Sequence, residues 1–279
     1  MGKRLLIFFL LFVPKHLLSH VGGFFCNIPV PTFLRGLIYR GYCAIFGARA
    51  QDAEHPFQHY RTINAWFTRT LKPGLRPVAP DCAVSPVDAA VGAAGTLSGD
   101  VMFQAKGRQY TLTALLGDAA LAKRMDGGSY ATLYLAPKDY HRIHSPLTAG
   151  IRKAVYIPGK LWPVNQAAVL HVDNLFAVNE RIVVELERPN GGVMAVVAVG
   201  ATMVGMTRLA FDDLHTNAWK RVVDQRVYAP HKPIQAGDWL GQFEFGSTVI
   251  LACSKDCAAL DALTVGQTVR MGQRLGALV

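Results

Sequence analysis

The segment at residues 181–205 constrains the fold of this chain more than any other. It reads RIVVELERPNGGVMAVVAVGATMVG, in which two apolar runs flank the turn residues Pro189, Asn190, Gly191 and Gly192. Two runs rich in β-branched residues on either side of such a turn predict a β-hairpin, and the length of the second run predicts a buried strand. Any fold for this chain must therefore contain an antiparallel pair with a covered strand.

The same texture of short apolar runs between Gly and Pro extends from Pro77 to the end of the chain. YATLYLAP predicts a buried strand and a turn, and GIRKAVYIPGKLWPVN predicts two extended pieces around its Pro-Gly step. One helix, from Thr111 to Met125, is expected to interrupt these strands. The last segment, LTVGQTVRMGQRLGALV, resembles the final strands of lipoyl- and biotinyl-type hybrid barrels, but it lacks the lysine of a carrier domain. No internal repeat stands out.

Residues 1–70 have a different pattern, that of amphipathic helices. The final helix has four apolar residues near helical spacing, Ile63, Trp66, Phe67 and Leu71. The Lys-Pro-Gly sequence at 72–74 is expected to end it. We therefore predict an α+β fold, with amphipathic helices at residues 1–70 followed by a β-rich domain of hybrid-barrel-like character at residues 71–279.

The N-terminal residues carry a short apolar run between basic residues. Residues 5–13 are apolar and Pro14 ends the run, whereas a bilayer-spanning helix needs about 20 apolar residues. The apolar sequence that follows is interrupted by Arg35, Arg40 and Arg49. Short apolar helices with basic residues between them are typical of helices that lie in a membrane interface. An ordinary pair of helices packed on the core would give the same pattern.

The composition limits which kinds of partner and which kinds of binding site we expect for this chain. The chain has 29 Lys and Arg against 19 Asp and Glu, a formal net charge of +10. This charge suits anionic lipid or acidic substrates, and because no basic cluster with stacking aromatics forms a nucleic-acid motif, we expect no nucleic-acid partner. Five scattered cysteines favour a reducing compartment over a disulfide framework. Cys253 and Cys257 lack a second ligand pair, so we expect no metal.

Four polar residues are candidates for chemistry. They are Asp88 in SPVDAAVG, His141 and His144 in KDYHRIHSP, and Ser247 in FEFGSTVIL. Asp, His and Ser form a catalytic triad only where the fold brings them together. From the residues alone, the histidines also fit metal ligands or a hydrogen-bonded turn, and the Gly246-Ser247 step also fits a β-bulge.

Several blocks, in one order, resemble the phosphatidylserine decarboxylase family, in its membrane-associated, pyruvoyl-dependent bacterial type. The blocks cover nearly the whole chain: YRTINAWFTRTLKPGLRPV, SPVDAAVG, FQAKGRQYTLTALLGD, YLAPKDYHRIHSP, YIPGKLWPVN, NLFAVNERIVVELE, VGATMVG and FGSTVI. The sequence departs from the family twice. Phe245 replaces the usual leucine before Gly-Ser-Thr, and Ala89 follows Asp88 where the family has glycine, so the turn there is expected to differ.

The resemblance implies that the chain cuts itself between Gly246 and Ser247. The Ser247 hydroxyl would attack the Gly246 carbonyl, with His144 as its base and Asp88 orienting that base. Elimination and hydrolysis would then convert Ser247 into a pyruvoyl group. The products would be a large chain, 1–246, and a small chain, 247–279.

The resemblance also implies a substrate and a cofactor. The pyruvoyl group would form a Schiff base with the amine of phosphatidylserine and take up electrons as CO2 leaves, giving phosphatidylethanolamine. His141 is the candidate proton donor. The family further implies a homodimer and a peripheral position on the cytoplasmic side of the cell membrane, with an anionic membrane surface as partner. The helix at 111–125 would either receive the diacylglycerol part or pack in the core.

Three other functions remain open at this point. A serine hydrolase would keep Ser247 as its nucleophile and would stay a single chain. A zinc hydrolase would use His141, His144 and Asp88 as ligands. A non-catalytic membrane-binding β module would leave Ser247 unconverted.

Overall fold

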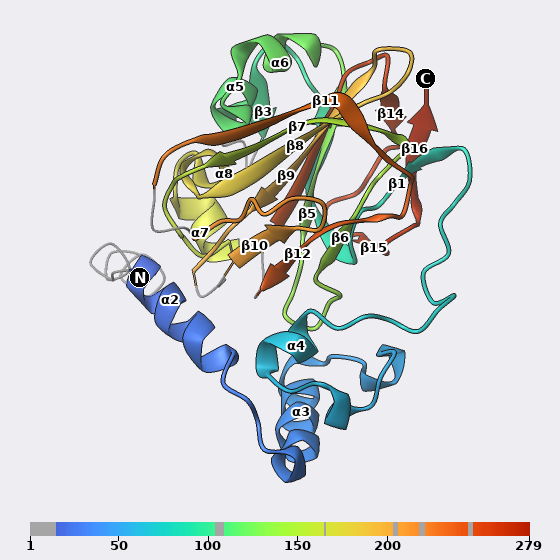
Figure 1. Cartoon of the computed structure of the whole chain (residues 1–279). Helices are drawn as coiled ribbons and strands as arrows, with labels where there is room; N and C mark the ends of the chain where they lie inside the picture. The colour runs from blue at the N-terminus through green and yellow to red at the C-terminus, as the bar shows by residue number, and fades with distance from the viewer. Residues whose placement is uncertain (1–14, 104–108, 165, 203–205, 218–220, 245–247) are drawn as a thin grey trace.

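The computed structural model describes residues 15–103, 109–164, 166–202, 206–217, 221–244 and 248–279. Figure 1 shows a β-rich body with the N-terminal helices grouped below it. The helices are α2 (Lys15–Cys26), α3 (Thr32–Phe46), α4 (Ile63–Phe67), α5 (Leu112–Leu116), α6 (Ala119–Arg124), α7 (Gln166–His171) and α8 (Leu175–Val178). The strands are β1 (Cys82–Val84), β2 (Ala89–Thr96), β3 (Val101–Phe103), β4 (Gln109–Thr111), β5 (Ser129–Tyr134), β6 (Arg142–His144), β7 (Ala149–Ile157), β8 (Arg181–Glu187), β9 (Val193–Val199), β10 (Met206–Leu209), β11 (Asp224–Ile234), β12 (Trp239–Glu244), β13 (Thr248–Cys253), β14 (Ala258–Leu260), β15 (Thr268–Val269) and β16 (Arg274–Leu278).

The predicted hairpin forms the centre of an eight-stranded antiparallel sheet. Its strand order is β11-β7-β8-β9-β13-β5-β2-β15. Strand β8 pairs with β9 from Arg181 opposite Val199 to Glu187 opposite Val193, which confirms the hairpin. The smaller sheets are β1-β16-β14, β10-β12-β6 and β3-β4. The α+β class is confirmed, but across the described residues the strands close no barrel, because β15 joins the large sheet and β16 joins a separate one.

Both faces of the large sheet are buried at its central strands, as β13 illustrates, whereas the edge strand β11 is largely exposed. Val249 and Leu251 belong to one core cluster, and Ile250 and Ala252 to the cluster on the other face. Helices α5, α6 and α8 and the sheet β3-β4 cover the second face, whereas the sheets β1-β16-β14 and β10-β12-β6 cover the first (Figure 1). Each fully buried large aliphatic side chain contributes about 1.5–3 kcal/mol. The sheet is therefore a rigid frame from which its strand ends present the site.

The single helix predicted from Thr111 to Met125 is wrong. Gly117 has a φ of +66° and ends α5 in the left-handed conformation, which glycine adopts at little cost. Asp118 then caps α6 by accepting a hydrogen bond from the Leu121 N–H at 3.0 Å. The apolar side chains of both helices are buried in the core. Of the two roles expected for this segment, the structure supports core packing.

Two other predicted elements are shorter than expected. Helix α4 begins after Thr62, whose hydroxyl accepts from the Ala65 N–H at 3.0 Å, but it ends at Phe67. Leu71 instead forms an isolated bridge with Ala53. The first extended piece around Pro158 is strand β7, whereas the second is reduced to a bridge at residue 160, and residues 161–164 form no strand.

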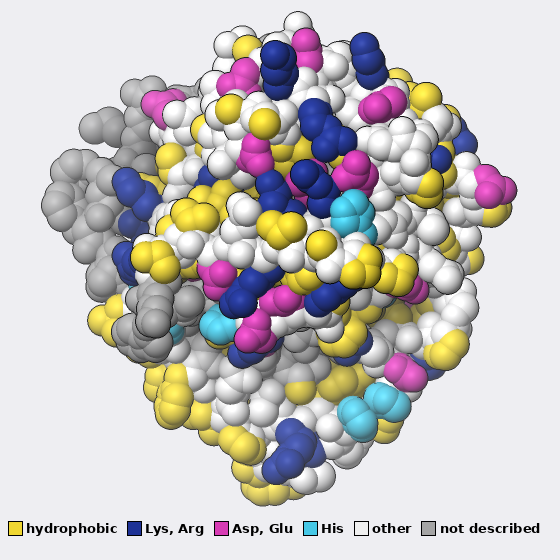
Figure 2. All heavy atoms as spheres, turned by 45° about the horizontal axis from the view of Figure 1, so that its top comes forward, with side chains coloured by type: hydrophobic (Ala, Val, Ile, Leu, Met, Phe, Trp, Pro, Cys, Tyr) yellow, Lys and Arg dark blue, Asp and Glu magenta, His cyan; other side chains and the backbone are white. Residues whose placement is uncertain are grey.

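Helices α2 and α3 leave a large apolar surface exposed. We call it the apolar face, and its most exposed side chains are Leu17, Phe24, Phe25, Phe33, Leu37 and Ile45. Figure 2 shows hydrophobic side chains gathered along the lower edge of the molecule, where these helices lie. No helix in the described part of the chain is long and apolar enough to cross a membrane. The opposite side of α2 contacts the β-rich body, where the Lys15 ammonium lies 4.1 Å from the centre of the Trp162 ring.

Candidate active site

Two Ser-Pro turns bring the Asp88 and His144 segments side by side. The His144 N–H donates to the Pro86 carbonyl at 2.9 Å, and the Val84 N–H donates to the Pro146 carbonyl at 2.8 Å. Residues 58 and 62 positions apart in the chain are thus joined through their backbones. Ala89 is the first residue of β2 and is not among the residues with positive φ. The alanine that departs from the family pattern is therefore accommodated without strain.

The histidine block also lies beside the strand that leads to the predicted cleavage site. Strand β6 pairs with β12, with His144 opposite Trp239, and the Phe243 N–H donates to the His141 carbonyl at 3.0 Å. Strand β12 ends at residue 244 and β13 begins at residue 248. The predicted cleavage residues, Gly246 and Ser247, and the preceding Phe245 lie outside the described residues.

His144 is held in the tautomer that a general base needs. Its Nδ1 lies 2.7 Å from the Gly237 carbonyl oxygen, so this nitrogen carries the proton and donates it. Its Nε2 lies 3.0 Å from the Tyr140 hydroxyl and accepts from it. Burial lowers the pKa of His144 and raises the pKa of Tyr140 to about 12. The imidazole is therefore neutral and the phenol protonated near pH 7.

Asp88 does not contact His144, and the carboxylate has two other partners. Arg76 donates to it from two nitrogens, from Nε to Oδ1 at 2.8 Å and to Oδ2 at 3.1 Å, and from Nη2 to Oδ2 at 2.5 Å. The Met271 N–H donates to Oδ1 at 2.9 Å. Asp88 acts on His144 only through its charge, which favours the protonated imidazole and partly opposes the effect of burial on the pKa. The Gly237 carbonyl, and not Asp88, fixes the tautomer.

His141 is fully buried and has one unused nitrogen. Its Nδ1 donates to the Asp139 carbonyl at 2.9 Å, and its ring packs against Phe67 with centroids 3.9 Å apart. The Nε2 atom has no hydrogen-bond partner among the described residues. Burial lowers the pKa of His141 to about 3. In this state Nε2 carries a lone pair, so His141 can act as a proton donor only after it has accepted a proton.

Sequence reasoning missed three groups that complete the site. Tyr140 stands within the histidine block, and its position four residues before His144 was the available signal. Arg76 and Gly237 carry no local signal, because each meets its partner only through the fold. Within the described residues no group of three His, Cys, Asp or Glu side chains could hold a metal ion. The separate contacts of Asp88, His141 and His144 give no support to the zinc hydrolase.

Comparison with known proteins places these residues in a family. The family model described as phosphatidylserine decarboxylase matches residues 63–277, a range that contains every candidate residue. The chain belongs to the phosphatidylserine decarboxylase family. A phosphatidylserine decarboxylase proenzyme of Anaeromyxobacter sp. is 45% identical over 99% of both chains. A proenzyme of the same description from Myxococcus xanthus is 42% identical over 95% of both chains.

More distant relatives match over the same length. The phosphatidylserine decarboxylase proenzyme of Brevibacillus brevis is 38% identical over 99% of this chain and 98% of its own length. This decarboxylase family therefore covers the N-terminal helices as well as the β-rich body. The family assignment from sequence blocks is confirmed, and the word proenzyme in the names of the relatives agrees with maturation by cleavage.

Proposed function

We propose that this chain decarboxylates phosphatidylserine to phosphatidylethanolamine after cutting itself between Gly246 and Ser247. The observation that carries the proposal is similarity over the full length to proteins described as phosphatidylserine decarboxylase proenzymes. The mature protein would then contain chains 1–246 and 247–279, with a pyruvoyl group derived from Ser247.

The geometry around His144 supports its role in self-cleavage. A serine hydroxyl is a weak nucleophile until a base accepts its proton. The Nε2 atom of His144 holds a lone pair, and its strand lies directly beside β12, which ends two residues before Gly246. The Tyr140 hydroxyl donates a hydrogen bond to that lone pair. We propose that this hydrogen bond breaks when the Ser247 hydroxyl binds to Nε2. Asp88 stabilises the imidazolium through its charge rather than by contact.

The surroundings of residue 247 also fit a pyruvoyl group. Two buried polar atoms, His141 Nε2 and the Oγ1 of Thr248 directly after residue 247, have no partner among the described residues, and the His141 backbone bonds to Phe243 on the strand that leads to residue 247. Buried polar groups without partners are rare, and a catalytic role or a bound group is among the reasons for them. A pyruvoyl group there would supply a carbonyl that reacts with the substrate amine and an electron sink for the bond that breaks. His141 Nε2 would accept a proton from solvent and then donate it to the substrate carbon that has lost CO2.

The exposed helices support a peripheral membrane position. The apolar face would enter the membrane interface, and the net charge of +10 would favour an anionic surface. We place the protein on the cytoplasmic side of the cell membrane, as a homodimer. Binding to vesicles that contain phosphatidylglycerol, with the double variant Phe24→Ser/Phe33→Ser as the comparison, tests the membrane part of this proposal.

Intact-mass spectrometry tests the central claim. Wild-type protein is expected to give two chains, the smaller with a blocked N-terminus, and Ser247→Ala is expected to give one intact chain. Release of CO2 from phosphatidylserine should accompany the two-chain form only. A single wild-type chain that hydrolyses esters would favour the serine hydrolase, and a single inert chain would favour the β module.

A further inference from the structure

Among the described residues, the buried cation Arg69 has no carboxylate partner. Arg69 lies two residues after the end of α4 and is only 3% exposed. The two terminal nitrogens reach the Trp66 and Lys138 carbonyls at 3.4 and 3.3 Å, and within the described residues Nε has no partner. Burial lowers the pKa of this guanidinium. A charge removed from water is costly unless it is paired, so Arg69 is suited to receive an anion.

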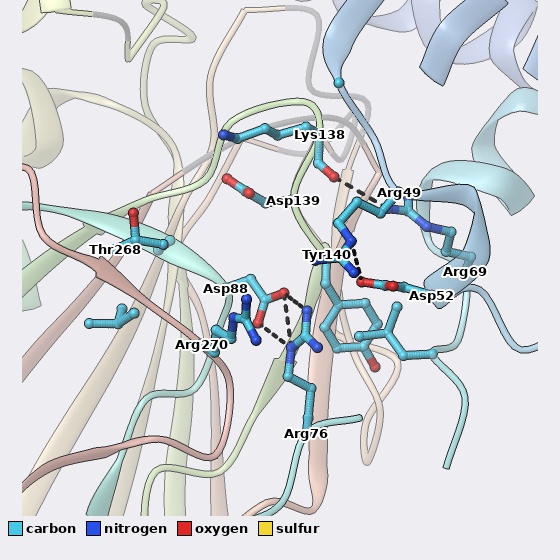
Figure 3. Close-up of a pocket in the computed structure, with 14 residues that line it drawn as sticks. Arg49, Asp52, Arg69, Arg76, Asp88, Lys138, Asp139, Tyr140, Thr268 and Arg270 are labelled. Carbon is cyan, nitrogen blue, oxygen red and sulfur yellow. Dashed lines mark hydrogen bonds and ion pairs between the residues drawn. The ribbon is translucent and has the colours of Figure 1, made fainter. Parts of the chain in front are cut away.

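Arg69 lines a small hollow of about 210 Å³ that is rich in cations. We call it the basic hollow, and its charged lining residues are Arg49, Asp52, Arg69, Arg76, Asp88, Lys138, Asp139 and Arg270 (Figure 3). Two of its cations are already neutralised, because Arg49 pairs with Asp52 at 3.3 Å and Arg76 pairs with Asp88. In the described part of the chain, Arg69, Lys138 and Arg270 make no ion pair.

The basic hollow lies between the apolar face and the strand that begins after the predicted cleavage site. Gly47 lines it, directly after the exposed Ile45 and Phe46 at the end of α3. Ala89 also lines it, and the next residue, Ala90, pairs with Tyr134. Tyr134 in turn pairs with Thr248. A lipid whose chains lie on the apolar face would bring its headgroup to this hollow.

We propose that Arg69, Lys138 and Arg270 bind the phosphodiester of the phosphatidylserine headgroup. This inference rests on the proposed function and names the part of the substrate that the hollow receives. The headgroup carries two anions, a phosphodiester and a carboxylate. Arginine contacts that stabilise the carboxylate would oppose its loss as neutral CO2, whereas the phosphodiester keeps its charge throughout the reaction. The cations therefore suit the phosphodiester.

Steady-state kinetics in detergent mixed micelles test the assignment. Lys138 and Arg270 are exposed, so the double variant Lys138→Gln/Arg270→Gln is expected to fold and to process itself normally. Its KM for dioleoylphosphatidylserine should rise about tenfold, since a hydrogen bond to a charged group contributes this much or more, while kcat stays within about twofold. The Arg69→Gln variant should raise KM in the same way, provided that it cleaves itself. If it does not cleave itself, the KM of the Lys138→Gln/Arg270→Gln variant alone tests the proposal.

A matched control removes two cations elsewhere. Lys123 and Arg226 are exposed and lie outside the basic hollow. Lys123→Gln/Arg226→Gln lowers the net charge equally, so it corrects for general attraction to the micelle. An equal rise of KM in both double variants would overturn the proposal.

Binding to the uncleaved Ser247→Ala chain separates this site from the proposed chemistry. Short-chain phosphatidylglycerol shares the phosphodiester but has no serine, and it should bind about tenfold more weakly when Lys138 and Arg270 are also replaced. Retention of that binding in the triple variant would refute the site. Inorganic phosphate that competes fully with the lipid at millimolar concentration would identify a site for free anions instead. If wild type neither cleaves itself nor releases CO2, the proposed function fails. The binding experiment is independent of that result, because it uses the uncleaved chain.

Discussion

The turn at residues 85–88 and the turn at residues 145–148 are built alike. In each, the serine hydroxyl donates to the carbonyl two residues ahead at 2.7 Å. The serine N–H donates at 2.8 Å to a residue that follows a glycine, Gln273 in one turn and Asp238 in the other. Those glycines, Gly272 and Gly237, have φ of +81° and +85° and each donates back to the serine carbonyl at 2.9 Å. The two halves of the site therefore repeat one local structure.

The repeat differs where the candidate residues lie. Asp88 accepts from the Met271 N–H at 2.9 Å, and Thr148, at the equivalent place, accepts from the Ala236 N–H at 3.1 Å. His144 likewise stands where the other turn has Val84, as their reciprocal bonds to the two prolines show. The short hydrogen-bond acceptor Thr148 and the apolar side chain of Val84 are thus sufficient for the turn to form at these two positions. The carboxylate and the imidazole exceed what the turn needs, which supports a chemical role for both.

Replacing His144 by its counterpart gives the largest expected effect. His144→Val should keep the backbone pairing with β12 but remove the base, and self-cleavage should slow by about 10²–10⁴-fold. A time course of intact mass after expression measures it. The control is Thr148→Val in the same turn, which should be cleaved at the wild-type rate. Normal cleavage of His144→Val would exclude this residue as the base.

Replacing Asp88 by its counterpart gives a smaller effect. Asp88→Thr keeps an acceptor for the Met271 N–H but removes the charge that favours protonated His144. Cleavage should slow about tenfold if the pKa of His144 falls by one unit. The free energy of unfolding should also fall by about 1–3 kcal/mol, because Arg76 is left without its carboxylate partner. Arg76→Gln in the same chain should restore stability in urea unfolding but not the rate, and recovery of both would assign Asp88 a structural role alone.

The pH dependence of cleavage should be weak near neutrality. Only the neutral His144 accepts a proton, so the rate falls as the pH drops through its pKa. Because burial lowers that pKa below the ordinary value of 6.5, more than half of the imidazole is neutral at pH 6.5. Cleavage should therefore slow by less than about twofold between pH 7.5 and 6.5. A rate that halves above pH 6.5 would contradict the neutral, buried imidazole described here.

The smallest effects should come from the shared serines. Ser85→Ala and Ser145→Ala each remove one buried hydroxyl bond to a carbonyl. Both should lower the free energy of unfolding by about 1 kcal/mol, measured in the uncleaved Ser247→Ala chain. Near-equal losses would show that the two turns are equivalent in energy as well as in geometry. A loss in one turn only would show that the resemblance between them ends at the backbone.

Local sequence was sufficient where neighbouring residues decide the structure. The hairpin at β8 and β9 was predicted because its turn and its apolar runs are contiguous. The helix at 111–125 failed for an equally local reason, since Gly117 and Asp118 end one helix and begin another. The repeat of the two turns was not recognised, because their shared serine and proline are common residues and their common hydrogen bonds reach distant strands.

The sequence by itself determined the family and the fold class and predicted four candidate side chains, because these depend on residue type and order. Only the tertiary structure decided which atom each side chain meets. The Gly237 carbonyl that sets the tautomer of His144 lies 93 residues further along the chain, and the Met271 N–H that holds Asp88 lies 183 residues away. Hydrogen bonds depend on position in space, and over such separations only the packed sheets bring donor and acceptor together.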